Sequence, residues 1–328
     1  MIRRYWTRIV PSVLAAAIAV AALPLAQPAA AQGGYPDKPI RFVVCCTGFP
    51  EATARVIAAE ITERSGVQIV VEAKPGANGI LATEAVAKAP PDGYTVLIGS
   101  NSTHAANEVL YRKLPYDPVR DFAPLSGISQ GTLLLAVRPT LSAKTVQELT
   151  ALAKAEPGKL TYGWGSSSTR AAVELYKLHA GVKITDVPYR TNPQAAVDLL
   201  GGRIDLVISD LVSLKQHVDA GNLRALAVSS DQRAATLPDV PTMAEAGVSG
   251  YKLTFWIAAW MPAGTPPALV DRLNRIFTDA VRSPRVAEFL ARGGSVPHAT
   301  TPAELGAFQQ AETRKWREIV TAAGIQPE

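Results

Sequence analysis

Three groups of small polar residues each follow a short apolar segment that is typical of a β-strand. The groups are Thr47, Gly48 and Phe49; Ser102, Thr103 and His104; and Ser166, Ser167, Ser168, Thr169 and Arg170. Each lies between a strand's carboxyl end and the start of a helix, the edge where open parallel sheets bind ligands. Helix N-termini and hydroxyl donors suit an anion, although the same residues also cap ordinary helices. Three groups at equivalent places predict a shared anion site.

Two charged residues lie close to these groups. Asp210 follows the predicted strand Ile204–Ile208 and should face the ligand from a second lobe, or cap the helix that starts near Leu211. Arg170 lies in the first turn of the predicted helix that reaches His179. It could bind a carboxylate through two parallel hydrogen bonds, or pair with Glu174 four residues on. Both alternatives remain open for both residues.

The only two cysteines, Cys45 and Cys46, are adjacent. Neighbouring cysteines bridge only in a strained ring, so we expect two thiols or a labile bridge. Their place at a strand end permits either a buried packing role or shielding by a ligand in the cleft.

No motif of a known enzyme class occurs in the sequence. Walker loops, G-x-G-x-x-G, G-x-S-x-G and H-E-x-x-H are all absent, and the four histidines are isolated. Ser167, His104 and Asp210 could in principle form a triad, but nothing in their sequence context supports one. We therefore predict no catalytic residue, no metal and no cofactor.

The N-terminal residues 1–31 are typical of a secretory signal peptide. Arg3, Arg4 and Arg8 precede an apolar stretch that is too short to span a bilayer, and small residues precede Gln32. Without this segment, which holds three Arg and no acidic residue, the net charge falls from +5 to +2. We expect a soluble, monomeric periplasmic protein, and the near balance of charge gives no support for nucleic-acid binding.

The rest of the chain alternates short apolar runs with amphipathic helices, which predicts an α/β fold with parallel-rich sheets flanked by helices. No single linker separates two consecutive domains, so we expect two lobes joined by more than one crossover. The predicted division is 32–132 for lobe 1, 133–257 for lobe 2 and 258–328 for the return to lobe 1. Leu133–Val137 and Phe255–Ala259 are the candidate crossovers.

The chain resembles the Bug-type, TctC-like periplasmic receptors of tripartite tricarboxylate transporters over residues 35–325. The resemblance rests on an ordered series of blocks: Tyr35-Pro36-Asp37-Lys38-Pro39-Ile40, Lys74-Pro75-Gly76-Ala77-Asn78-Gly79, Pro91-Asp92-Gly93-Tyr94-Thr95, Leu114-Pro115-Tyr116-Asp117-Pro118, Val187-Pro188-Tyr189, Asp198-Leu199-Leu200-Gly201-Gly202 and Pro238-Asp239-Val240-Pro241-Thr242. It implies a two-lobed periplasmic binding protein fold that closes on a small carboxylate in a cleft between the lobes. It also implies membrane components of such a transporter as partners.

Two loops depart from the family pattern. The first usually resembles V-P-F-x-A-G-G-S-T-D, whereas this chain has Val44-Cys45-Cys46-Thr47-Gly48-Phe49 and is shorter. The second usually resembles A-G-x-G-S-x-x-H, whereas Arg170 stands where His is usual. These departures leave two alternatives to a transport receptor: a sensor-type or ligand-free binding protein uncoupled from transport, and a periplasmic hydrolase that uses Ser167 or a cysteine thiolate.

Overall fold

The computed structural model describes residues 35–322 and 324–327. Residues 38–328 form one compact unit, and residues 35–37 belong to a separate N-terminal one. The predicted signal peptide, residues 1–31, lies outside the described residues. Within the described ranges, no helix is both long enough and apolar enough to cross a membrane.

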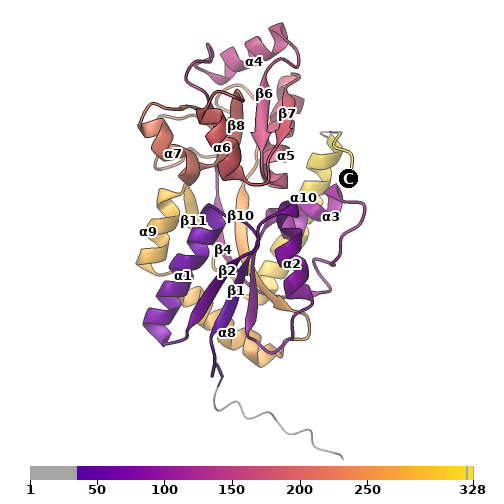
Figure 1. Ribbon diagram of the computed structural model, residues 1–328, viewed down its shortest axis with the longest axis vertical. Helices are drawn as coiled ribbons and strands as arrows, with labels where there is room; N and C mark the ends of the chain where they lie inside the picture. The colour runs from indigo at the N-terminus through magenta and orange to yellow at the C-terminus, as the bar shows by residue number, and fades with distance from the viewer. Residues whose placement is uncertain (1–34, 323, 328) are drawn as a thin grey trace, which may run out of the picture. The chain divides into compact units, whose positions relative to one another are not determined.

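Two β-sheets organise residues 38–328 (Figure 1). The six-stranded sheet has the order β11 (Ser295–Pro297), β4 (Phe122–Gly131), β10 (Phe255–Pro262), β3 (Thr95–Ser100), β1 (Ile40–Val44) and β2 (Ile69–Ala73). The five-stranded sheet has the order β7 (Thr185–Pro188), β6 (Thr161–Trp164), β8 (Leu206–Asp210), β5 (Leu133–Val137) and β9 (Arg224–Val228).

Helices flank both sheets. Beside the six-stranded sheet lie α1 (Phe49–Ser65), α2 (Ile80–Ala87), α3 (Asn107–Leu110), α8 (Pro267–Val281), α9 (Pro284–Arg292) and α10 (Pro302–Ala322), with a 3₁₀-helix η1 (Ala77–Gly79) and a π-helix η2 (Ser102–Ala106). Beside the five-stranded sheet lie α4 (Val146–Ala155), α5 (Ser167–Ala180), α6 (Asn192–Leu200) and α7 (Leu211–Asp219). The predicted α/β architecture with two lobes is therefore confirmed.

The expectation of parallel-rich sheets needs a correction, because both sheets are mixed. β1 is parallel to β2 and β3, and β6 is parallel to β7 and β8. In contrast, β10 is antiparallel to both of its neighbours, and so is β5. Parallel neighbours need a helical crossover between them. No helix directly precedes β5 or β10. At β5 the chain passes from the six-stranded to the five-stranded sheet, and at β10 it returns.

The two candidate crossover segments are themselves regular strands. Leu133–Val137 is β5 of the five-stranded sheet, and Phe255–Ala259 lies within β10 of the six-stranded sheet. The chain changes sheet at Thr132, between β4 and β5, and changes back before Phe255. The exact lobe boundaries at 132 and 257 remain a prediction.

Local sequence explains where α1 begins and ends. Pro50 occupies the first turn, where a missing N–H costs nothing, and Gly66 ends the helix in a left-handed conformation with φ of 75°. Helix α1 matters for the site because its N-terminus follows β1 directly, at the carboxyl end of the sheet.

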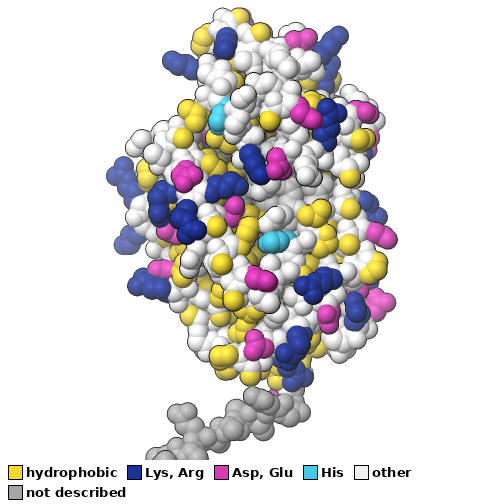
Figure 2. Space-filling view, turned by 180° about the vertical axis from the view of Figure 1, so that it is seen from behind, with side chains coloured by type: hydrophobic (Ala, Val, Ile, Leu, Met, Phe, Trp, Pro, Cys, Tyr) yellow, Lys and Arg dark blue, Asp and Glu magenta, His cyan; other side chains and the backbone are white. Residues whose placement is uncertain are grey.

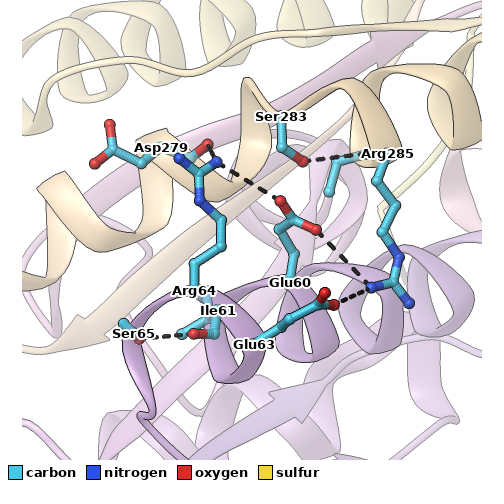
Figure 3. Close-up of polar contacts among 9 residues, drawn as sticks. Glu60, Ile61, Glu63, Arg64, Ser65, Asp279, Ser283 and Arg285 are labelled. Carbon is cyan, nitrogen blue, oxygen red and sulfur yellow. Dashed lines mark hydrogen bonds and ion pairs between the residues drawn. The ribbon is translucent and has the colours of Figure 1, made fainter.

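Ion pairs fix the opposite end of α1 to the helices of the returning chain (Figure 3). Arg285 of α9 lies 2.9 Å from the Glu63 carboxylate and 3.9 Å from that of Glu60. Arg64 lies 3.6 Å from Glu60 and donates to the Asp279 carbonyl of α8 at 3.2 Å. Exposed pairs of this kind add little stability. They do bind α1 to α8 and α9, which helps to set the direction in which its N-terminus points.

On one face of the molecule, charged side chains of both signs are interspersed (Figure 2). This face therefore presents no broad single-sign field of the kind that long-range steering of a polyanion would use.

Candidate functional site

A cavity lies between the two sheets, at their facing strand ends. We call it the central cavity. Its wall is formed by Cys45, Cys46, Thr47, Phe49, Pro50, Pro75, Gly76, Asn78, Gly79, Ser100, Asn101, Ser102, Leu133, Gly165, Ser166, Ser168, Thr169, Arg190, Thr191, Asn192, Asp210, Phe255 and Ile257.

The three predicted polar groups meet at this cavity. Thr47 and Phe49 come from the β1–α1 junction, Ser102 from η2, and Ser166, Ser168 and Thr169 from the β6–α5 junction. Asp210, at the end of β8, completes the set. The strand-end argument therefore located the cavity, whereas the role of these residues in ligand binding stays a prediction.

Thr103 and His104 do not belong to the cavity wall, contrary to the prediction. Both are fully buried, because η2 turns their side chains toward the core behind Ser102. The His104 ring stacks on Trp260 with ring centroids 3.6 Å apart, and its Nδ1 is 2.9 Å from Thr103 Oγ1. Burial holds the pKa of His104 well below its ordinary value. His104 is therefore a neutral core residue.

Gly48, Ser167 and Arg170 also lie outside the wall. Gly48 provides a positive φ of 80° that aims α1, and Ser167 donates to Asn107 Oδ1 at 3.0 Å. Arg170 lies instead in a separate small pocket, where its guanidinium carbon is 5.0 Å from the Trp164 ring centroid. The helix turn that puts Ser166, Ser168 and Thr169 on the central cavity directs Ser167 and Arg170 elsewhere.

The chain itself caps two of the helices that begin at the cavity. The Ser166 hydroxyl accepts from the Thr169 N–H in a capping box that begins α5, and Asp210 Oδ1 accepts from the Ser213 N–H to begin α7. The capping alternative for Asp210 is thus confirmed. By contrast, neither α1 nor α6 has a side-chain cap. The N-terminus of α1 keeps a positive partial charge and backbone donors that an anion can use.

Asn101 places an unpaired donor in the wall. The residue is 1% exposed, and its Nδ2 has no hydrogen-bond partner among the described residues. A buried donor left unpaired costs about 1–3 kcal/mol. Sites retained at such a cost are often ones where a ligand supplies the acceptor.

Arg190 is the only Lys or Arg among the described residues that form the wall. Arg190 follows β7 of the five-stranded sheet, but its side chain reaches across the cavity. Its Nε lies 4.0 Å from the position that a Cβ on Gly76 would occupy. It makes no ion pair or hydrogen bond with any other described residue. The strand-end argument that found the three polar groups also applies to β7, and it would have found Arg190.

Close backbone approach holds this part of the wall together. A Cβ added to Gly165 would stand 2.1 Å from the carbonyl carbon of Thr191, so only glycine fits there. The Asn192 side chain accepts from the Gly165 N–H at 3.0 Å and from the Thr169 hydroxyl at 3.1 Å. The β6–α5 and β7–α6 junctions therefore form one rigid surface.

The family model for the tripartite tricarboxylate transporter family receptor, TctC, matches residues 53–325. The chain belongs to the TctC family. Among curated relatives, BugT of Bordetella pertussis is 34% identical over 295 residues, which cover 88% of this chain and 90% of that protein.

Solved structures of the TctC type share the fold. R. palustris Rpa4515 with adipate has a TM-score of 0.85 and 34% identity, covering 90% of this chain and 100% of that one. MatC from Rhodopseudomonas palustris with bound malate has a TM-score of 0.80 and 28% identity, covering 86% and 99%. The periplasmic binding protein BugD gives 0.84 and 28%, covering 90% and 100%. These neighbours are binding proteins rather than enzymes.

The cavity wall also contains two cysteines and an apolar patch. The resemblance placed Pro-Phe and paired glycines in the first loop, where this chain has Cys45 and Cys46, both in the wall. Apolar surface comes from Phe49, Phe255 and Ile257. The two phenylalanine rings meet edge to face, with centroids 5.8 Å apart. Sequence patterns gave no signal for Phe255 and Ile257, because every residue of β10 is buried whether or not it faces the cavity.

Proposed function

We propose that this protein is a periplasmic solute-binding protein that captures a small carboxylate for the membrane components of a tripartite tricarboxylate-type transporter. The observation that carries the proposal is the buried Asn101 Nδ2, a donor in the cavity wall that lacks an acceptor. A carboxylate oxygen is the acceptor that best matches it, because the uncapped N-terminus of α1 borders the same cavity.

Arg190 supplies the charge that selects an anion. A guanidinium binds a carboxylate through two parallel, charge-assisted hydrogen bonds, and Arg190 has no competing carboxylate partner. The cavity also contains Asp210, whose Oδ1 is occupied by the α7 cap. A second carboxylate on the ligand would be repelled near Asp210, so the charged end of the ligand belongs near Arg190 and Asn101.

The relatives favour the same ligand class. The R. palustris relative was solved with adipate, and MatC was solved with malate, both of which are small carboxylates. The predicted signal peptide at residues 1–31 would deliver the chain to the periplasm, where the name of BugD places that protein.

Ligand capture would act through closure of the two sheets around the cavity. A ligand stabilises the closed arrangement only as far as it binds that arrangement better than the open one. Residues from both sides form the wall, so a ligand in contact with Asn101 and Arg190 bridges the two sides. This bridging is the differential contact that closure requires.

A thermal-shift screen of the purified protein tests the ligand class. We expect one or more mono-, di- or tricarboxylates, aromatic acids or amino acids to raise the melting temperature, because a ligand that binds only the native state stabilises it. Neutral sugars serve as the control and should have no effect. Stabilisation by a sugar together with no response to any acid would contradict the proposal.

Coupling to transport needs a separate test. Cells that lack the gene should lose uptake of the radiolabelled acid identified in the screen, and the wild-type gene should restore it. A gene that encodes Arg190→Ala should restore much less uptake at low substrate concentration. Normal uptake in cells without the protein would indicate a binding protein that acts outside transport.

A further inference from the structure

Cys45 and Cys46 lie side by side at the end of β1, and both belong to the wall of the central cavity. Their sulfur atoms are 2.8 Å apart and share a hydrogen bond, and both cysteines are free. Cys45 is buried and Cys46 is half-buried. They are the only cysteines in the 328-residue chain, so neither has any other disulfide partner within the same molecule.

We propose that Cys45 and Cys46 form a reversible dithiol site. Small-molecule disulfides such as oxidised glutathione oxidise it to a vicinal disulfide, and this oxidation controls the ligand loop, residues 46–48 between β1 and α1. This site is additional to carboxylate binding. Its oxidation requires no particular ligand, and only its effect on ligand capture rests on the proposed function.

The reaction has two thiol–disulfide exchange steps. The Cys46 thiolate, which lies on the more open side of the pair, attacks one sulfur of oxidised glutathione, and one glutathione thiolate leaves. The Cys45 sulfur then loses its proton and attacks Cys46 Sγ, expelling the second glutathione thiolate. Overall the protein loses two protons and two electrons, and oxidised glutathione gains both to give two molecules of glutathione.

Covalent geometry makes this bond reversible rather than a permanent link. Adjacent Cα atoms across a trans peptide are about 3.8 Å apart, whereas disulfides usually span about 4.4–6.8 Å between Cα atoms. The bridged pair is therefore strained, and strained disulfides are the ones that reducing thiols reopen readily. The hydrogen bond with Cys46 and burial both raise the pKa of the Cys45 thiol in the reduced pair.

The strain must be taken up on the cavity side of the pair. The Cys45 N–H donates to the Ile98 carbonyl at 3.1 Å, within the ladder of the six-stranded sheet. Its Cβ is also packed against Gly79, where an added Cβ would stand 3.0 Å away. Cys45 is thus held on two sides. Movement falls on Cys46, Thr47 and Gly48, the segment that leads into the uncapped N-terminus of α1.

Mass spectrometry of the full chain tests the chemistry. The reduced protein is incubated with oxidised glutathione under native conditions, and free thiols are then counted. We expect both thiols to disappear with the loss of two hydrogen atoms per molecule, and dithiothreitol to restore them. A persistent glutathione adduct, a covalent dimer or two unreacted thiols would each overturn the proposal.

Hydrogen exchange tests the control of the loop. Oxidation should change the exchange of amides in residues 46–52 of the wild type and leave the five-stranded sheet unchanged. Cys46→Ser is the matched control because it keeps a small polar group in the wall. Treated with oxidised glutathione, this variant should not lose two hydrogen atoms, and its hydrogen exchange should not change. Cys45→Ala provides a second single-thiol control if Cys46→Ser folds poorly. Oxidation without any change in residues 46–52 would overturn the link to the ligand loop.

These measurements do not depend on the carboxylate proposal. If no acid binds in the thermal-shift screen, the mass and exchange results still decide the dithiol site. If an acid does bind, its affinity should differ between reduced and oxidised wild type and should be unaffected by oxidised glutathione in Cys46→Ser.

Discussion

The hydroxyl oxygens of Ser102 and Ser168 lie 2.9 Å apart, although Ser102 begins η2 beside the six-stranded sheet and Ser168 lies in α5 beside the five-stranded sheet. Both residues are buried. A second bond, from Ser167 of α5 to Asn107, joins α5 to α3, the helix that follows η2 directly. Two of the predicted polar groups are therefore in direct contact, and this contact exists only while the two sides of the cavity are together.

A double-mutant cycle should measure this contact. Ser102→Ala and Ser168→Ala each leave a buried hydroxyl without its partner, so their effects on the free energy of unfolding should not add. We expect a coupling energy of about 1 kcal/mol from urea unfolding, the usual net value for one neutral hydrogen bond. Ser142→Ala is the control, because Ser142 is exposed and distant in the chain. Additive effects for Ser102 and Ser168 would mean that the contact does not persist in solution.

Arg190→Ala should weaken carboxylate binding more than it changes stability. Loss of a charge-assisted contact costs about 1.5–3 kcal/mol, which corresponds to at least about tenfold in the dissociation constant. Isothermal titration with the best acid from the screen measures it, and Arg190→Lys should retain part of the affinity. Arg203→Ala is a matched control, since Arg203 pairs with Asp198 on the surface. Equal affinities for wild type and Arg190→Ala would remove Arg190 from the site.

Asn101→Ala should separate binding from folding. The variant removes the donor that lacks a partner in the ligand-free protein, so the melting temperature without ligand should fall by only a few degrees. The shift produced by the carboxylate should become much smaller, because the ligand then has one donor fewer. Differential scanning fluorimetry with and without the acid gives both values. A full ligand-induced shift in the variant would show that Asn101 only packs.

The fold was predictable because its elements are strongly patterned. The sequence predicts a buried strand at Ile40–Val44 and a helix at Val146–Ala155, and these match β1 and α4 residue for residue. The segments of β5 and β10 were named as crossovers, but their antiparallel direction was not predicted. Strand direction depends on which strands become neighbours in the sheet, and no local residue pattern encodes that pairing.

The wall of the cavity was only partly predictable for a related reason. Position after a strand identified Thr47, Ser102 and Ser166, but it could not tell which residues of the following turn face inward. Thr103 and His104 are turned into the core by a π-helix, and such helices have no simple sequence signature.

A buried acid in α10 illustrates the same limit. Glu312 interrupts the apolar stripe of that helix, and only the structure explains it. Its carboxylate accepts a hydrogen bond at 2.9 Å from the indole N–H of Trp256, which lies in a strand 56 positions earlier in the chain. A long-range polar pair of this kind leaves no periodic trace in either segment.

His104 should make the protein less stable in acid. Burial lowers the pKa of the folded-state ring well below its ordinary value of 6.5, and Nε2 has no hydrogen-bond partner in the described residues. As the pH falls below about 6.5, the unfolded chain binds a proton at this position and the folded protein does not, so the free energy of unfolding decreases. The expected slope from this residue is about 1.4 kcal/mol per pH unit until the folded-state pKa is reached.

His104→Phe keeps an aromatic ring against Trp260 and should remove that slope, while stability near pH 8 changes little. Urea unfolding of both proteins between pH 8 and pH 5 measures the difference. His298→Phe is the comparison, because His298 is only half-buried and burial lowers its pKa less strongly. Identical pH dependence in wild type and His104→Phe would mean that His104 gains a proton in the folded protein as readily as in the unfolded chain.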